Sequence, residues 1–111
     1  MKNRILIVES DAPTAVELEE ALQEAGFRTV GPAFDGFEAA ELMRSGTIDA
    51  AVLDPGLLGG EWGELVGRLG ADGVPVLYLS GREGGLASTT MPMRACTPGD
   101  VVRQVRRALA V

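Results

Sequence analysis

Three short apolar runs limit the folds that are open to this chain of 111 residues. They are Ile5–Val8, Ala50–Leu53 and Val74–Leu79. Uninterrupted runs of this length are typical of strands that are covered on both faces, as in parallel sheets. A weaker run, Arg28–Ala33, contains Gly31 and Pro32, which favours an edge strand. Met91–Cys96 is a poor candidate for a fifth strand.

Segments with a helical spacing of apolar residues alternate with these runs. They cover residues 12–25, Phe37–Met43, Trp62–Leu69 and Val101–Leu109. Alternation of strand and helix predicts an α/β fold with a parallel sheet. Right-handed crossovers then favour a flavodoxin-like, doubly wound, five-stranded parallel sheet with strand order 2-1-3-4-5. Between Ser80 and Met91 lies GREGGLASTT, which contains three glycines, so we expect the fourth helix to be missing or vestigial.

Two of the expected helices have recognisable starts. Thr97, Pro98 and Asp100 supply a cap, a first-position proline and an acidic residue in the first turn. Asp11 is read as the cap of the helix over residues 12–25, and Gly26 is read as its stop.

The composition excludes several classes of protein. The length predicts a single domain, residues 1–111, with no output domain attached. The net charge of −6 argues against nucleic acid or an anionic membrane as a partner. A single cysteine, Cys96, cannot form an internal disulfide and fits a reducing compartment. The apolar runs are too short for a signal peptide or a membrane span, so we expect a cytoplasmic protein.

Polar residues follow the expected strands where the apolar runs end. They are Glu9 and Ser10 after the first strand, Asp54 after the third, Ser80 after the fourth and Arg94 near the fifth. The carboxyl ends of parallel strands meet at one edge of the sheet, so these side chains are expected to face one crevice. Two carboxylates there repel each other and need a cation or a proton. Mg²⁺ fits, because it binds one or two carboxylates together with water and a phosphoryl group. Each of these residues alone is what an ordinary strand end or helix cap would show. Their occurrence together favours a functional site.

Four segments carry a resemblance to a known family. They are ILIVESD, AAVLDPGLLGG, PVLYLSG and MRACTPGD. With them the chain resembles the response-regulator receiver domains of two-component signalling, as an atypical single-domain member. The resemblance implies that Asp54 is the phospho-acceptor and that Glu9 and the backbone carbonyl of Gly56 help it to hold Mg²⁺. It also implies that Ser80 and Arg94 contact the phosphoryl group.

The chain departs from the family pattern at several positions. Ser10 stands where the family has a second acidic metal ligand, and a hydroxyl binds Mg²⁺ less well than a carboxylate. Arg94 stands at a lysine position, and its forked guanidinium is not interchangeable with an ammonium group. Ala95 replaces the following proline, and Met91 lies about where the family has an aromatic switch residue. We therefore expect weak binding of Mg²⁺.

Two functions of different classes remain open. In the first, the chain is a stand-alone receiver in a phosphorelay, and Asp54 accepts a phosphoryl group from a histidine kinase or phosphotransfer protein. In the second, it is a phosphorylation-independent pseudo-receiver, a protein-interaction module in which Arg94 pairs with Asp54. Both readings require a downstream protein partner and allow a homodimer. We expect no enzymatic activity beyond phosphorylation and dephosphorylation of the chain itself, because the sequence contains no P-loop or dinucleotide fingerprint.

Overall fold

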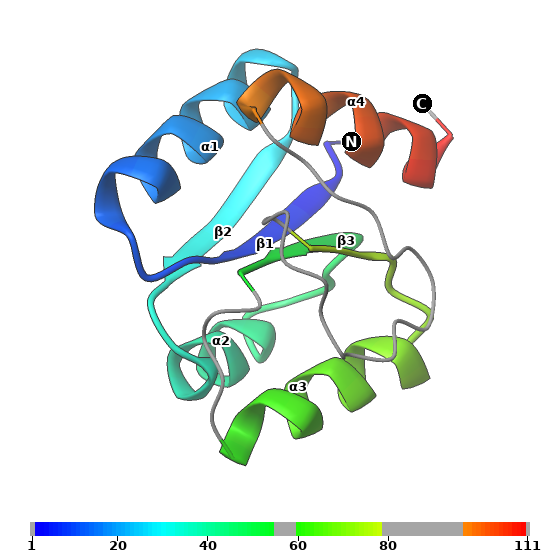
Figure 1. Ribbon diagram of the computed structural model, residues 1–111. Coiled ribbons are helices and arrows are strands. Elements are labelled where there is room, and N and C mark those ends of the chain that lie inside the picture. The colour runs from blue at the N-terminus through cyan, green and yellow to red at the C-terminus, as the bar shows by residue number, and fades with distance from the viewer. Residues whose placement is uncertain (1, 55–59, 79–96, 111) are drawn as a thin grey trace.

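The computed structural model describes residues 2–54, 60–78 and 97–110 of the chain. The strands are β1 (Arg4–Val8), β2 (Arg28–Ala33), β3 (Ala50–Leu53) and β4 (Val76–Tyr78). The helices are α1 (Ala12–Glu24), α2 (Gly36–Met43), α3 (Gly60–Ala71) and α4 (Pro98–Leu109). Strands and helices alternate along the chain, as the sequence predicts (Figure 1). None of the helices in these described ranges is both long enough and apolar enough to cross a membrane.

The four described strands form one parallel sheet in the order β2-β1-β3-β4. This order confirms the predicted arrangement 2-1-3-4 and places β2 at an edge, as expected from its glycine and proline. The predicted fifth strand, Met91–Cys96, lies outside the described residues. So does the segment 81–91, for which a missing or vestigial helix was predicted. The label α4 therefore belongs to the helix that starts after Thr97, not to that segment.

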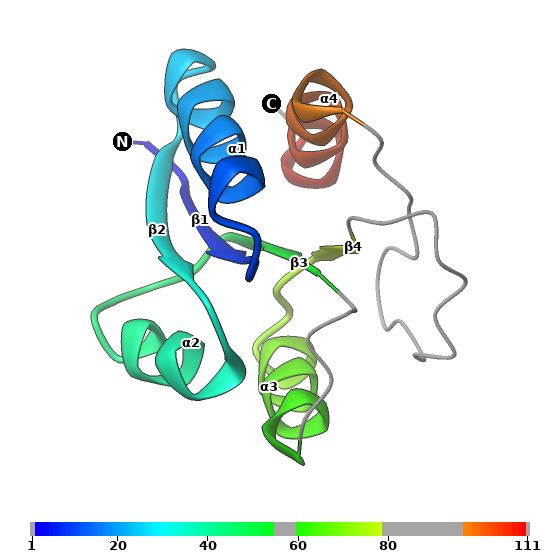
Figure 2. The ribbon, with the colours of Figure 1, turned by 60° about the vertical axis from the view of Figure 1, so that its left-hand side comes forward.

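Helices cover both faces of the sheet and enclose two separate cores. Figure 2 shows α1 and α4 together on one face and α2 and α3 on the other. Ile5 and Ile7 of β1 point into the core under α1 and α4, which includes Leu22 and Val101. Leu6 and Val8 belong to the core under α2 and α3. Such alternation is what a strand covered on both faces requires, because successive side chains point to opposite sides.

The helix starts follow the sequence signatures. The Asp11 side chain caps α1 by accepting a hydrogen bond from the Thr14 amide at 3.1 Å. Thr97 caps α4 by accepting one from the Asp100 amide at 3.1 Å, and Pro98 occupies the first turn. Both caps satisfy amides that have no partner within the helix.

The strand predicted over Val74–Leu79 begins later in the structure, at Val76. The Val74 amide donates to the Leu69 carbonyl at 2.9 Å and so closes the end of α3. Pairing with β3 begins at the carbonyl of Pro75, which accepts from the Ala51 amide at 3.0 Å. Val74 is nevertheless buried, which explains why the apolar run reads as one longer strand.

An irregularity in β2 adjusts the edge of the sheet beside β1. The register between the two strands shifts after Leu6, so that Val8 pairs with Ala33. Gly31 makes the shift possible with a φ of +103°, a conformation that residues with a side chain rarely adopt. A Cβ at this position would lie 2.7 Å from the Ala33 amide nitrogen and 2.9 Å from the Ile7 carbonyl oxygen. This backbone path therefore requires glycine.

Candidate functional site

Glu9 and Asp54 come directly after the two central strands. Val8 and Leu53 are partners in the β1–β3 register, and the Asp54 amide donates to the Val8 carbonyl at 3.0 Å. Side chains alternate along each strand, so Glu9 continues the row of Ile7 and Asp54 continues the row of Val52, on the side of α1 and α4. The two carboxyl groups are hydrogen-bonded to each other. The structure thus brings together two residues that lie 45 positions apart in the sequence.

The main chain of Glu9 is held by the edge strand. Its amide donates to the carbonyl of Ala33 at 2.9 Å, and Ala33 reaches this position because of the register shift at Gly31. This contact was not predicted from the sequence. The glycine–proline pair in β2 was the available signal, but it indicated only an edge strand and not a shift in register.

The environment of Glu9 favours its neutral form. Only 5% of the residue is exposed, and this burial is the largest of the effects that raise its pKa from 4.5 to about 7. The Asp11 amide donates to Glu9 Oε2 at 3.0 Å and lowers the pKa, whereas the hydrogen bond and the negative charge of Asp54 raise it. Near neutral pH the pair therefore readily accepts one positive charge, either a proton or a metal cation.

Asp11, close to Glu9 in the chain, is the N-cap of α1. Its carboxylate accepts hydrogen bonds from the amide of Thr14 at 3.1 Å and from the Thr14 hydroxyl at 2.5 Å. These bonds lower the pKa of Asp11 and fix it as the cap of α1. Ser10, between Glu9 and Asp11, is exposed. Within the described ranges no three His, Cys, Asp or Glu side chains form a group that could hold a metal ion. Among the described side chains, Glu9 and Asp54 are therefore the candidates to bind a cation at this edge.

Three further predicted site residues lie outside the described parts of the chain. They are Gly56, Ser80 and Arg94. Their roles as metal ligand and phosphoryl contacts stay predictions from the resemblance. The same holds for Ala95 and Met91, the positions at which the chain departs from the family pattern.

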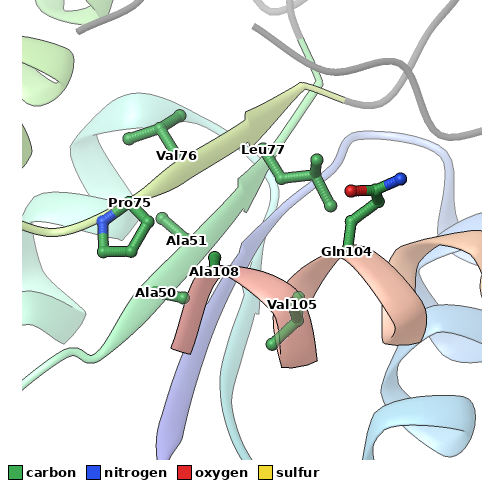
Figure 3. Close-up of a pocket in the computed structure, with 8 residues that line it drawn as sticks. All are labelled: Ala50, Ala51, Pro75, Val76, Leu77, Gln104, Val105 and Ala108. Atoms are coloured by element: carbon green, nitrogen blue, oxygen red, sulfur yellow. The ribbon is translucent and has the colours of Figure 1, made fainter. Parts of the chain in front are cut away.

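A small hollow at the other end of the sheet is separate from this site. It lies between β3, β4 and α4, and Ala50, Pro75 and Ala108 line it (Figure 3). Ala50 is the first residue of β3 and Pro75 precedes β4, so the hollow is at the amino ends of the strands. Its lining is mainly apolar, with Gln104 as the only polar side chain among the residues drawn in Figure 3. None of the side chains drawn in Figure 3 is charged.

The chain resembles known proteins in its structure. No protein-family model and no curated protein matches the sequence. Among solved structures, the BeF3-activated conformation of SdrG from Pseudomonas melonis matches over 100% of both chains, at 28% identity and a TM-score of 0.73. The chemotaxis response regulator CheY4 of Vibrio cholerae matches 98% of this chain over 100% of its own, at 18% identity and a TM-score of 0.79.

A longer protein shares the fold as well. The response regulator PhyR from Brucella abortus matches 98% of this chain at 20% identity and a TM-score of 0.76. The present chain spans about half of it, because the match covers 48% of PhyR. These structural neighbours show that the chain shares their α/β fold.

Proposed function

This chain has the receiver-domain fold of response regulators, and we propose that it accepts a phosphoryl group on Asp54 in a phosphorelay. One observation carries the proposal: the carboxyl groups of Glu9 and Asp54 meet at the carboxyl edge of β1 and β3. In an open parallel sheet, ligands bind in the crevice outside this edge. A carboxylate placed there beside a second acidic group can both attack a phosphoryl group and share a cation with its neighbour.

The reaction we propose is a transfer between two side chains. A carboxylate oxygen of Asp54 attacks the phosphorus of a phosphohistidine on the donor protein, in line with the P–N bond. A P–O bond forms as the P–N bond breaks, the electron pair stays on the imidazole nitrogen, and Asp54 becomes an acyl phosphate. Such a transfer depends mainly on positioning and on charge stabilisation. Ser80 and Arg94 are proposed to contact the phosphoryl oxygens, as the resemblance implies.

Mg²⁺ fits the described half of the site. Two carboxyl groups in contact, one of them with a pKa raised to about 7, form a place where a cation can replace the shared proton. We propose that Glu9, Asp54 and the carbonyl of Gly56 hold the ion, which when bound would offset negative charge on the phosphoryl oxygens. Ser10 is at most a weak additional ligand, and Asp11 is engaged as the cap of α1. Binding is therefore expected to be weak.

A second function is favoured by the same contact. A proton shared between Glu9 and Asp54 satisfies the pair without metal, and the exposed hydroxyl of Ser10 adds no charge that demands one. The chain would then act as a phosphorylation-independent pseudo-receiver through contacts with other proteins. On either reading it is a signalling module rather than a true enzyme, and its proposed partners are a histidine kinase or phosphotransfer protein and a downstream protein. A cytoplasmic location is part of the same proposal.

Intact-mass measurement after incubation with acetyl phosphate and Mg²⁺ tests the proposal. We expect the wild-type chain to gain one phosphoryl group, and the gain to disappear in Asp54→Asn and to fall strongly when the metal is chelated. Asp72→Asn is the matched control, because Asp72 is exposed at the end of α3 and far along the chain from the site. If neither acetyl phosphate nor a phosphorylated histidine kinase produces a mass gain that depends on Asp54, phosphorylation is wrong and the second function stands.

A further inference from the structure

The outer face of α1 is acidic. Glu17, Glu20 and Glu24 are exposed and follow one another at spacings of three and four residues, which places them on one side of the helix. The opposite side of α1, with Ala15, Leu18 and Leu22, is buried against the sheet. In the described part of the chain none of the three carboxylates forms an ion pair. Three negative charges therefore face solvent without a local counter-charge.

The outer face of α4 is basic. Arg103, Arg106 and Arg107 are exposed, whereas Val101 and Val105 on the opposite side are buried. Arg103 forms an ion pair with Asp100 of its own helix, and Arg106 donates to the Ala25 carbonyl at 3.4 Å. Arg107 has no ion pair among the described residues. This face therefore keeps a surplus of positive charge, although the chain as a whole carries −6.

The two faces belong to one surface. α1 and α4 lie on the same face of the sheet and contact each other (Figure 2). Both helices end towards the amino edge of the sheet, because α1 follows β1 and Ala108, near the end of α4, lines the hollow beside Ala50 and Pro75. Within the described residues no ion pair joins the carboxylates of α1 to the guanidinium groups of α4. The surface is thus an acidic stripe beside a basic stripe.

We infer that this α1–α4 surface is an interface between two copies of the chain. If two copies face each other across a two-fold axis that runs roughly along the helices, α1 of each copy lies over α4 of the other. Each acidic stripe then meets a basic stripe, which is the self-complementary contact that a two-fold dimer requires. A two-fold axis across the helices would place α1 over α1 and bring like charges together, so the charge pattern selects one orientation.

The size of the surface predicts a weak dimer. A helix of about 13 residues is about 20 Å long, and two neighbouring helices form a strip of about the same width. The total area buried by two copies is then about 800 Å², below the range of stable protein complexes. Exposed ion pairs are screened by salt, with a Debye length of about 10 Å at 0.1 M and about 3 Å at 1 M. The dimer should therefore be concentration-dependent and salt-sensitive.

The two exposed phenylalanines of the chain do not belong to this surface. Phe34 and Phe37 lie at the start of α2, on the other layer of the molecule. Their neighbours Asp35 and Glu38 are acidic and exposed, so a second copy docked there would meet like charge. The charge pattern thus favours the α1–α4 surface over the aromatic one as the contact between copies.

Sedimentation equilibrium of the full chain, without any phosphoryl donor, tests this inference independently of the proposed function. We expect a monomer–dimer equilibrium at low salt whose dissociation constant rises at least about tenfold at high salt. Glu20→Lys/Glu24→Lys should raise it by a similar factor, and so should Arg103→Glu/Arg107→Glu. Glu41→Lys/Glu64→Lys and Arg44→Glu/Arg68→Glu are matched controls. They change the net charge equally, but at exposed positions of α3 and of α2 with its C-cap Arg44.

Charge exchange gives the decisive result. A mixture of Glu20→Lys/Glu24→Lys with Arg103→Glu/Arg107→Glu should form a heterodimer about as stable as the wild-type dimer. All four of these substitutions in one chain should restore the homodimer. Circular dichroism confirms that each variant is folded. The inference is overturned if the wild-type chain is a monomer at low salt. It is also overturned if the α2–α3 controls weaken the dimer as much, or if the mixture does not recover it.

Discussion

Replacing Glu9 by glutamine should make the protein more stable at neutral and alkaline pH. The substitution keeps the size of the side chain and removes the buried carboxyl group of the Glu9–Asp54 pair. In the folded protein the pKa of Glu9 is about 7, against 4.5 for the ordinary side chain. At about 1.4 kcal/mol per unit, ionised Glu9 destabilises the folded state by up to about 3 kcal/mol. An amide also loses hydration on burial, so the expected gain is about 1–2 kcal/mol.

The sign of the pH dependence follows from the raised pKa. Between pH 4.5 and 7 the folded state binds more protons at Glu9 than the unfolded state does. The contribution of Glu9 to the free energy of unfolding is therefore largest below pH 4.5, falls as the pH rises to 7 and is constant above that value. The difference between Glu9→Gln and wild type should be small at acidic pH and should grow to its full size at about pH 7.

Urea unfolding followed by circular dichroism across this pH range measures the effect, with a chelator present throughout. Glu64→Gln is the control, because Glu64 is exposed on α3, outside both the acidic pair and the α1–α4 surface, and the substitution there removes no buried carboxyl group. Two results would contradict this prediction: a Glu9→Gln variant that is less stable than wild type at pH 8, or a difference in the free energy of unfolding from wild type that does not change between pH 5 and 8.

Three further predictions concern the metal, the edge strand and the hollow under α4. Millimolar Mg²⁺ should raise the melting temperature of the wild type at pH 8 but not that of Glu9→Gln or Asp54→Asn, because the ion needs both carboxylates; a similar rise in all three, by differential scanning fluorimetry, would place the metal elsewhere. Gly31→Ala should lower the free energy of unfolding by about 2–4 kcal/mol, since the new Cβ would lie within 3 Å of two backbone atoms; a loss below about 1 kcal/mol in urea unfolding would contradict this. Gln104→Leu should raise the free energy of unfolding by about 0.5–1 kcal/mol, because the buried Oε1 of Gln104 has no hydrogen-bond partner in the described part of the chain and adjoins an apolar hollow. Unchanged or lower stability in urea unfolding would contradict this.

Much of the fold follows from local patterns in the sequence. β2 and β3 have the predicted bounds, and the strand order 2-1-3-4 follows from alternation and crossover handedness. The caps at Asp11 and Thr97 depend only on neighbouring residues, so their prediction is confirmed. The start of β4 was wrong, because Val74 is buried yet serves the end of α3, and periodicity cannot distinguish these two uses of a buried residue.

The site was predictable in placement but not in energetics. Parallel strands bring Glu9 and Asp54 to one edge whatever the details of packing. The raised pKa of Glu9 depends on how completely the fold buries it, and the hydrogen bond from its amide to Ala33 depends on the shift at Gly31. Both are tertiary effects with no local signature. The metal ligands and phosphoryl contacts beyond this pair stay predictions.

Successive side chains of β1 point into two different cores, and this keeps the acidic pair in place when residues elsewhere in the sequence change. A slip of β1 by one residue would move Leu6 and Val8 into the space of Ile5 and Ile7, so both layers of helices oppose it at once. Solvent-facing residues can then be substituted without moving the crevice, because the aliphatic residues of the two cores hold β1 in register. A fold held in this way can be formed by quite different sequences, as the 18–28% identities at TM-scores of 0.73–0.79 illustrate.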